Sequence, residues 1–238
     1  HGDIIDAIDP LDPRWYGGLT GKGSIMQQIE RAKRNRLAIK DHLVCICDGN
    51  HPRKKWAFGA ITKDVSDWLE VPGGGWWYAI SYHNRRGELM YKHFCTHGRK
   101  TISSTADDPK RRRTNKQLIL KRLLKMKSGS CVLMSRGHTH WLDRLPPEHD
   151  VYYTDNGKEA YHQMTEADHT AEYIHPDLRW YVSTGSFVKP SIVNNDPAEV
   201  APITYSEAAD LDPTLWVGFM LAKIRNGRIQ EIEPVRVD

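Results

Sequence analysis

Long apolar runs and low-complexity tracts are both missing from this sequence of 238 residues. No apolar stretch approaches the roughly 20 residues that a membrane-spanning helix needs, so neither a membrane span nor a membrane partner is expected. The N-terminal residues also lack the basic and apolar regions of a secretory signal peptide. Aromatic and aliphatic residues recur throughout, which argues against a disordered chain. We therefore expect one domain with a substantial core, covering residues 1–238.

Paired cysteine motifs are absent as well. The four cysteines, Cys45, Cys47, Cys95 and Cys131, form no CxxC pair and no regular framework. In a chain of this length the pattern indicates reduced thiols in a cytoplasmic protein rather than a disulfide-bonded one. Cys45 and Cys47 fall in one predicted strand, where we expect their side chains on opposite faces. The 34 basic and 30 acidic residues give a net charge of +4, which is too small to identify a partner.

An initiating methionine is also lacking. The sequence begins at His1, inside what proves to be a motif, and we expect the chain to be a fragment of a longer protein.

The apolar patterns predict a mixture of helices and strands. Ser24 and Gln27 have the spacing of a capping box, so a helix should begin there with Ile25, Ile29 and Ala32 on one face. Strands and helices alternate early and hairpins dominate late, which favours layered sheets with helices outside them. The other predicted elements are a strand within 42–51 buried on both faces, a helix at 60–69, a hairpin of 76–84 with 88–98, a helix at 114–127, a strand within 130–140, and hairpins at 151–163 and 219–234.

Polar residues cluster where four of these segments end. The four junctions are Gly2-Asp3-Ile4-Ile5-Asp6, Gly49-Asn50-His51, Thr96-His97-Gly98 and Gly137-His138-Thr139-His140. Each alone is typical of an ordinary turn or a surface histidine. Together they lie at the carboxyl ends of strand-like segments, where α/β sheets gather ligands. Their Asp, Asn and His donors suit Mn²⁺, Fe or Zn²⁺ rather than Ca²⁺. Glycine beside each donor lets backbones approach one centre.

This ordered series, GDIID, GNH, THG and GHTH, resembles the calcineurin-like metallophosphoesterase superfamily over residues 2–140. STGSF at 183–187 is similar to the segment that follows the last metal motif in many small members. DPRW at 12–15 looks more like phage-type or bacterial members. The resemblance implies a four-layer α/β/β/α sandwich of two mixed sheets, here lacking its first strand.

The resemblance also implies an activity, the metal-dependent hydrolysis of phosphate mono- or diesters, with a nucleotide or nucleic acid as the leading substrate. Two divalent ions, of Mn, Fe, Zn or Ni, would activate water for attack on phosphorus. Asp3 would bridge the ions. Asn50, His97 and His138 would complete the second site, and His140 would belong to the first. His51 would be no ligand but would protonate the leaving alkoxide.

Two departures from the family pattern qualify these expectations. The Asp-x-His motif that normally precedes GD is absent, so the first ion keeps only Asp3 and His140 and should be weak or lost. Pro52 stands where the family has an acidic residue that orients the histidine, so His51 should be less well held. His93 is an alternative to His97 on the same face of its strand, but His97 is preferred because it lies at the strand end. Asp6 is expected to be a local hydrogen-bond acceptor rather than a ligand.

A basic segment suggests a second class of function. No acidic residue occurs from Lys110 to Leu142, and Arg111, Arg112 and Arg113 open a run of basic residues that could contact a phosphate-rich polymer. A solvated helix face is the simpler interpretation. The alternative to an enzyme is therefore a catalytically impaired nucleic-acid-binding module on the same fold, and a scaffold protein is a third class. The aromatic residues at 76–78 are expected in the core.

Overall fold

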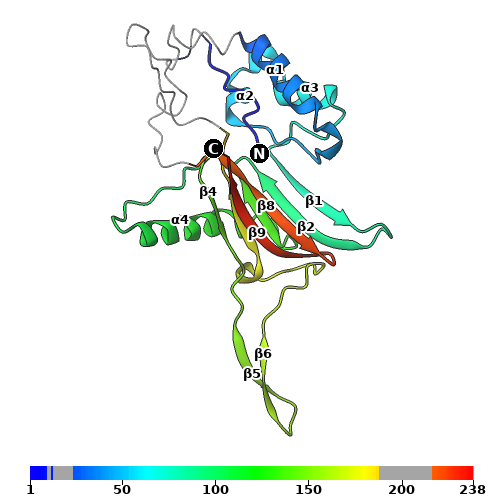
Figure 1. The fold of residues 1–238 in the computed structure, drawn as a ribbon, viewed down its shortest axis with the longest axis vertical. Helices are drawn as coiled ribbons and strands as arrows, with labels where there is room; N and C mark the ends of the chain where they lie inside the picture. Colours follow the sequence, from blue (N-terminus) through cyan, green and yellow to red (C-terminus); the bar gives the residue numbers. More distant parts are fainter. Residues whose placement is uncertain (10–11, 13–23, 188–215, 238) are drawn as a thin grey trace.

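The computed structural model describes residues 1–9, 12, 24–187 and 216–237, and their fold is of the mixed α/β type (Figure 1). Its main sheet has five strands in the order β1–β2–β3–β7–β4. The pairs β2/β3 and β3/β7 are parallel, whereas β1/β2 and β4/β7 are antiparallel, so the sheet is mixed. The strands are β1 (Trp77–His83), β2 (Leu89–Thr96), β3 (Leu133–Arg136), β7 (Trp180–Thr184) and β4 (Leu142–Leu145).

Both faces of this sheet are covered. Helix α4 (Pro109–Leu124) packs on one face, where Leu120 and Leu124 meet Phe94, Met134 and Tyr181. The hairpin of β8 (Gly218–Arg225) and β9 (Arg228–Arg236) lies on the other. There Ile229 and Ile232 join a cluster with Val132, Trp180 and Val182. The alternation of strand residues between the two clusters is the period-two pattern of a sheet buried on both sides.

A second group of elements packs beside the sheet near the N-terminus (Figure 1). Its helices are α1 (Ile25–Leu37), α2 (Asn50–Lys54) and α3 (Ile61–Trp68), and its short 3-10 turns are η2 (Lys40–His42) and η3 (Trp56–Phe58). Ile29 of α1 and Val65 of α3 share a cluster with Ile5 and Ile46. The predicted capping box is confirmed, since Ser24 accepts from Gln27 N and the Gln27 side chain accepts from Ser24 N.

Three sequence expectations about local structure were inaccurate. Residues 42–51 do not form the predicted strand. Only Ile46 pairs in the manner of a strand, through one bridge to Gly73, because the facing segment is rich in Pro and Gly and forms no continuous β-ladder. Trp77 is 58% exposed rather than in the core, since β1 is an edge strand with alternating burial. Helix α4 begins five residues earlier than predicted, where Asp108 caps it and Pro109 takes the first position.

The late hairpins are confirmed. β8 and β9 join through Asn226-Gly227, whose φ angles of 50° and 74° are both positive, as a type I′ turn requires. The other hairpin, β5 (Val151–Asp155) with β6 (Ala160–Met164), is mostly exposed and extends away from the sheet (Figure 1). A last short turn, η4 (Pro176–Leu178), precedes β7. In the described part of the chain no helix has the length and apolar character to cross a bilayer. Residues 13–15 of the DPRW segment lie outside the described residues.

Candidate metal centre

The four polar junctions meet at one edge of the main sheet. His97 directly follows β2 and His138 comes two residues after β3, and these neighbouring strands are parallel, so their carboxyl ends lie together. Asn50 is the first residue of α2, and Asp3 precedes the first helix in an irregular segment. The structure thus brings Asp3, Asn50, His97 and His138 together from four separate stretches of sequence.

Their ligand atoms are closely spaced around a common centre. His97 Nε2 lies 2.7 Å from Asn50 Oδ1 and 3.1 Å from Asp3 Oδ2. His138 Nδ1 lies 3.0 Å from Asn50 Oδ1 and 3.2 Å from His97 Nε2. Adjacent ligands in an octahedral site with bonds of about 2.1 Å are about 3.0 Å apart. The four atoms therefore have the mutual spacing of ligands on a small divalent ion.

The protonation of His97 makes this convergence electrostatically demanding. His97 Nδ1 lies 2.7 Å from the carbonyl oxygen of His1, and a carbonyl can only accept, so Nδ1 carries the proton. A neutral His97 then turns the lone pair of Nε2 toward Asp3 Oδ2 and Asn50 Oδ1, which are acceptors too. Three acceptors at this distance repel one another unless a proton or a cation lies among them. The donor set is therefore suited to a cation.

The backbone is strained at the same place. Asp3, His138 and His140 have φ angles of 43°, 74° and 54°, in a region that residues other than glycine rarely adopt. Such strain tends to gather at functional sites, where the surrounding structure imposes it. The glycines matter as the sequence predicted, because a Cβ at Gly2 would collide with the His97 ring and one at Gly49 would collide with Asp3.

His51 lies beside the cluster and is buried, with 5% of its surface exposed. Its backbone N–H donates to Asp3 Oδ1 at 2.9 Å, and its Nδ1 donates to the carbonyl oxygen of Asp6 at 2.9 Å. Pro52 has no side-chain acceptor that could orient the imidazole of His51, and the Asp6 carbonyl orients it instead. Nε2 of His51 then faces Asp3, with 4.0 Å between it and Oδ2.

A cavity of about 420 Å³ opens over these residues and is also lined by His140. Burial lowers the pKa of His140, and burial together with the charge of His97 lowers the pKa of His138 to about 4. Burial alone would raise the pKa of Asp3. When a proton on His97 Nε2 takes the place of an ion, the hydrogen bond that it makes to Asp3 and the positive charges of His51 and His97 lower that pKa. At neutral pH the imidazoles of His138 and His140 are therefore neutral, each with one unprotonated nitrogen, and Asp3 is ionised, as metal ligands must be.

Other residues named from the sequence lie elsewhere. His93, the alternative ligand, is bonded to Ser135 Oγ at 2.6 Å and does not join the Asp3 group. Arg111, Arg112 and Arg113 lie on α4 and do not line the 420 Å³ cavity. Arg113 forms a two-pronged ion pair with Asp143, at 2.6 and 2.7 Å.

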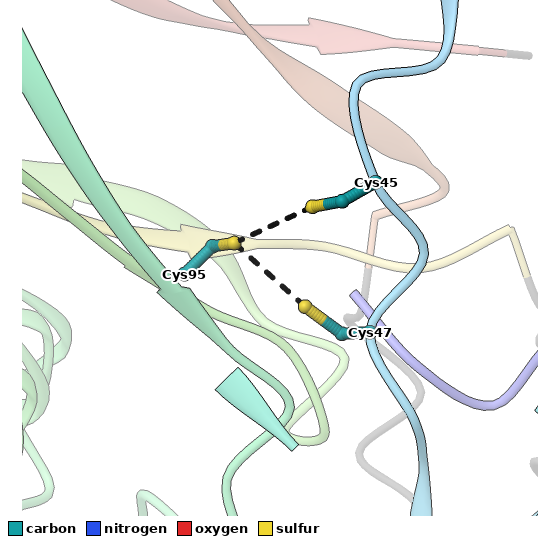
Figure 2. A group of neighbouring side chains, drawn as sticks. All are labelled: Cys45, Cys47 and Cys95. Carbon is teal, nitrogen blue, oxygen red and sulfur yellow. Dashed lines mark hydrogen bonds between the residues drawn. The ribbon is translucent and has the colours of Figure 1, made fainter. Parts of the chain in front are cut away.

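Sequence reasoning missed two features around this centre. Arg36 of α1 lines the cavity, and no motif marked it. Cys45 and Cys47 do not lie on opposite faces, because residues two apart in an extended chain share a face, and both point toward Cys95 (Figure 2). Their two-residue spacing was the signal that could have revealed this.

Comparisons of the chain with protein-family models, with curated proteins and with solved structures yield no match.

Proposed function

We propose that this protein is a metal-dependent phosphoesterase of the calcineurin-like metallophosphoesterase type, on a four-layer α/β/β/α fold. The observation that carries the proposal is the convergence of Asp3 Oδ2, Asn50 Oδ1, His97 Nε2 and His138 Nδ1, with neighbouring distances of 2.7–3.2 Å. The four residues come from motifs in the order of that superfamily. A buried histidine beside them supplies the group that the chemistry further needs.

The donor set fits a divalent ion of the Mn, Fe, Zn or Ni class, since it mixes carboxylate and amide oxygens with neutral imidazoles. Asp3, Asn50, His97 and His138 would hold one ion. Asp3 and His140 would contribute to a second, which the chain's own residues hold less completely. Such ions, when bound, acidify water and neutralise charge on phosphoryl oxygens.

His51 is assigned the proton transfer to the leaving group. Its Nδ1 proton is held by the Asp6 carbonyl, so the tautomer and the ring orientation are set, and Nε2 is the atom that exchanges a proton. When protonated there, the ring can donate to the departing alkoxide oxygen. Asp3 accepts from the His51 backbone and so keeps the ring next to the ligand cluster.

The cavity supports the proposed substrate class. Its roughly 420 Å³ is within the range of small-molecule sites and suits a phosphate mono- or diester of nucleotide size. Arg36 on its wall offers a guanidinium group to a phosphate. Because Arg111, Arg112 and Arg113 lie outside the cavity, the proposal does not depend on a long polyanion.

The test is metal binding and hydrolysis by the whole chain. Purified without chelators, the wild-type protein should contain a transition metal by elemental analysis. After chelation and readdition of Mn²⁺ it should hydrolyse bis-p-nitrophenyl phosphate. Asn50→Ala and His138→Ala should each lose the tightly bound ion and the activity together.

His162→Ala is the matched control, because His162 lies on the exposed hairpin β5–β6. This variant should change neither the metal content nor the rate of hydrolysis. A wild-type chain that binds no Mn²⁺, or ion binding unaffected by Asn50→Ala and His138→Ala, would overturn the proposal. Tight ion binding with no hydrolysis, joined to salt-sensitive DNA or RNA binding, would favour the impaired nucleic-acid-binding module instead.

A further inference from the structure

A second cluster of potential ligands lies next to the first and consists of three thiols. Cys45 and Cys47 follow η2 on the extended segment that leads to Asn50, and Cys95 lies on β2 (Figure 2). Sγ of Cys95 is 4.0 Å from Sγ of Cys45 and 3.7 Å from Sγ of Cys47. All three sulfurs lie within 4.8 Å of one another.

These separations match thiolates around one ion. Four sulfurs placed tetrahedrally about Zn²⁺ with bonds of about 2.3 Å are about 3.8 Å apart. Three sulfurs in a plane around an ion at the same bond length are about 4 Å apart. A disulfide would need about 2.05 Å between two of them and would leave the third thiol over. The geometry thus favours a shared ion over a covalent pair.

The surroundings of the three thiols differ from those of the fourth cysteine. Buried thiols often serve as small apolar side chains. Cys131 does so, because it belongs to a hydrophobic cluster with Phe94 and Leu120, and its sulfur accepts a hydrogen bond from Ser128 Oγ at 3.1 Å. Cys45, Cys47 and Cys95 belong to none of the hydrophobic clusters in the described part of the chain. Their sulfurs face one another instead.

We infer that Cys45, Cys47 and Cys95 bind one thiophilic cation, Zn²⁺ or Cu⁺, as thiolates. Soft sulfur ligands select these ions over Mg²⁺, Ca²⁺ and Mn²⁺. Binding releases the thiol protons to solvent and involves no change of oxidation state. Cys47 and Cys95 are buried and Cys45 is partly exposed, so the ion enters past Cys45.

The number of ligands distinguishes the two ions. Among the described residues no further His, Cys, Asp or Glu atom joins the group. Cu⁺ is satisfied by three thiolates, whereas Zn²⁺ would complete a tetrahedron with water or an external thiol.

The ion would act as a clip between two segments. No backbone hydrogen bond joins residues 43–49 to β2 in the described structure. Cys47 precedes Asn50 by three residues, and Cys95 precedes His97 by two. An ion on the thiols therefore fixes the two segments that carry Asn50 and His97. This structural role rests on the proposed function, but ion binding by the thiols does not.

Co²⁺ is the probe that separates this site from the Asp3 cluster. Added to reduced, metal-free protein under anaerobic conditions, it should produce an intense sulfur-to-cobalt charge-transfer band in the near ultraviolet, which N/O ligands do not give. One equivalent of Zn²⁺ or of Cu⁺ should remove the band, and the ion that competes better in the presence of a chelator is the preferred one. Cys45→Ser, Cys47→Ser and Cys95→Ser should each abolish it or weaken Zn²⁺ binding about 100-fold or more.

Cys131→Ser is the matched control and should keep the band. Asn50→Ala and His138→Ala should keep it too, while losing Mn²⁺, so the two sites fail independently. Should a cysteine variant not fold, the wild type still decides, because bound Zn²⁺ must protect three thiols from alkylation. Absence of the band in wild type, its survival in Cys95→Ser, or a disulfide in the untreated protein by mass spectrometry would overturn the inference.

Discussion

Two ligand clusters with different chemistry share two segments of the chain. The polar cluster consists of Asp3, Asn50, His97 and His138, and the thiol cluster consists of Cys45, Cys47 and Cys95. The polar cluster takes Asn50 and His97 from the shared segments, and the thiol cluster takes Cys47 and Cys95, two or three residues earlier. The polar cluster has hard oxygen and nitrogen donors under an open cavity. The thiol cluster has soft donors and faces inward, with two of its three members buried.

This difference agrees with the two proposed roles, an open catalytic site and a closed structural site. An ion that does chemistry needs open positions and access to substrate, whereas a structural ion is surrounded by its ligands. The strained φ angles fall on Asp3, His138 and His140 alone among the residues of the two clusters. The surrounding structure has to maintain the strained backbone at the polar cluster, and an ion bound by the three thiols would contribute to this.

The largest effect is expected on the rate of hydrolysis, from a change at His51, which contacts only the polar cluster. His51→Asn should reduce the hydrolysis of an alkyl phosphate ester about 1,000-fold, because the leaving alkoxide loses its proton donor. A p-nitrophenyl ester, whose leaving group needs no proton, should lose far less. Steady-state rates on the two esters measure this, and the Mn²⁺ content and the cobalt–thiolate band should stay unchanged. Equal losses on both esters would contradict the assigned role.

The next effect concerns ion affinity. His138→Ala should weaken Mn²⁺ binding about 100-fold or more, since it removes a direct ligand. Isothermal titration calorimetry measures it. His93→Ala is the discriminating control, because His93 is bonded to Ser135 outside the polar cluster and should leave Mn²⁺ affinity within about 3-fold. A larger loss of Mn²⁺ affinity from His93→Ala than from His138→Ala would show that His93, and not His138, is the ligand.

The contrast between the clusters also explains what the sequence could predict. Asp3, Asn50, His97 and His138 sit in motifs beside glycines at segment ends, and the parallel pairing of β2 and β3 brings such ends together. The mixture of strands and helices and the late hairpins followed from apolar patterns and from Asn-Gly turns. These signals are local, and they can be read without coordinates.

The thiol cluster was missed for two reasons. Cys95 is 48 residues from Cys47, and no local pattern pairs them. The expectation that Cys45 and Cys47 face opposite ways was also wrong, since a period of two places them together. The prediction for Trp77 failed because its burial depends on which strand lies at the sheet edge, which is a property of the assembled fold. The strand predicted within 42–51 failed because the segment meets only a Pro- and Gly-rich partner, with one bridge from Ile46 to Gly73.

A smaller effect, on stability and on ion binding at both clusters, is expected from a substitution at Gly49. Gly49→Ala adds a Cβ that would collide with Asp3, on the segment between Cys47 and Asn50. It should lower the free energy of unfolding by about 2–3 kcal/mol and weaken binding at both clusters. Urea unfolding and the Mn²⁺ and Co²⁺ titrations measure this. Gly129→Ala, whose Cβ would have ordinary contacts at 3.5 and 3.8 Å, should change the unfolding free energy by less than about 1 kcal/mol.

The smallest effect is the acid sensitivity of the metal-free fold. It compares His138 of the polar cluster with His93 of β2, which lies two residues before Cys95. Burial lowers the pKa of both His93 and His138 to about 4, below the ordinary value of 6.5. The unfolded chain then binds more protons between pH 6.5 and pH 4, so stability is full above pH 6.5 and falls as the pH drops through that window. From pH 7 to pH 5 His93 should account for about 1–2 kcal/mol of the loss. His138 should account for less, because solvent screens a group beside an open cavity. Urea unfolding in EDTA should show a flatter pH dependence for His93→Asn than for His138→Asn, and the reverse order would place the more strongly desolvated histidine at the polar cluster.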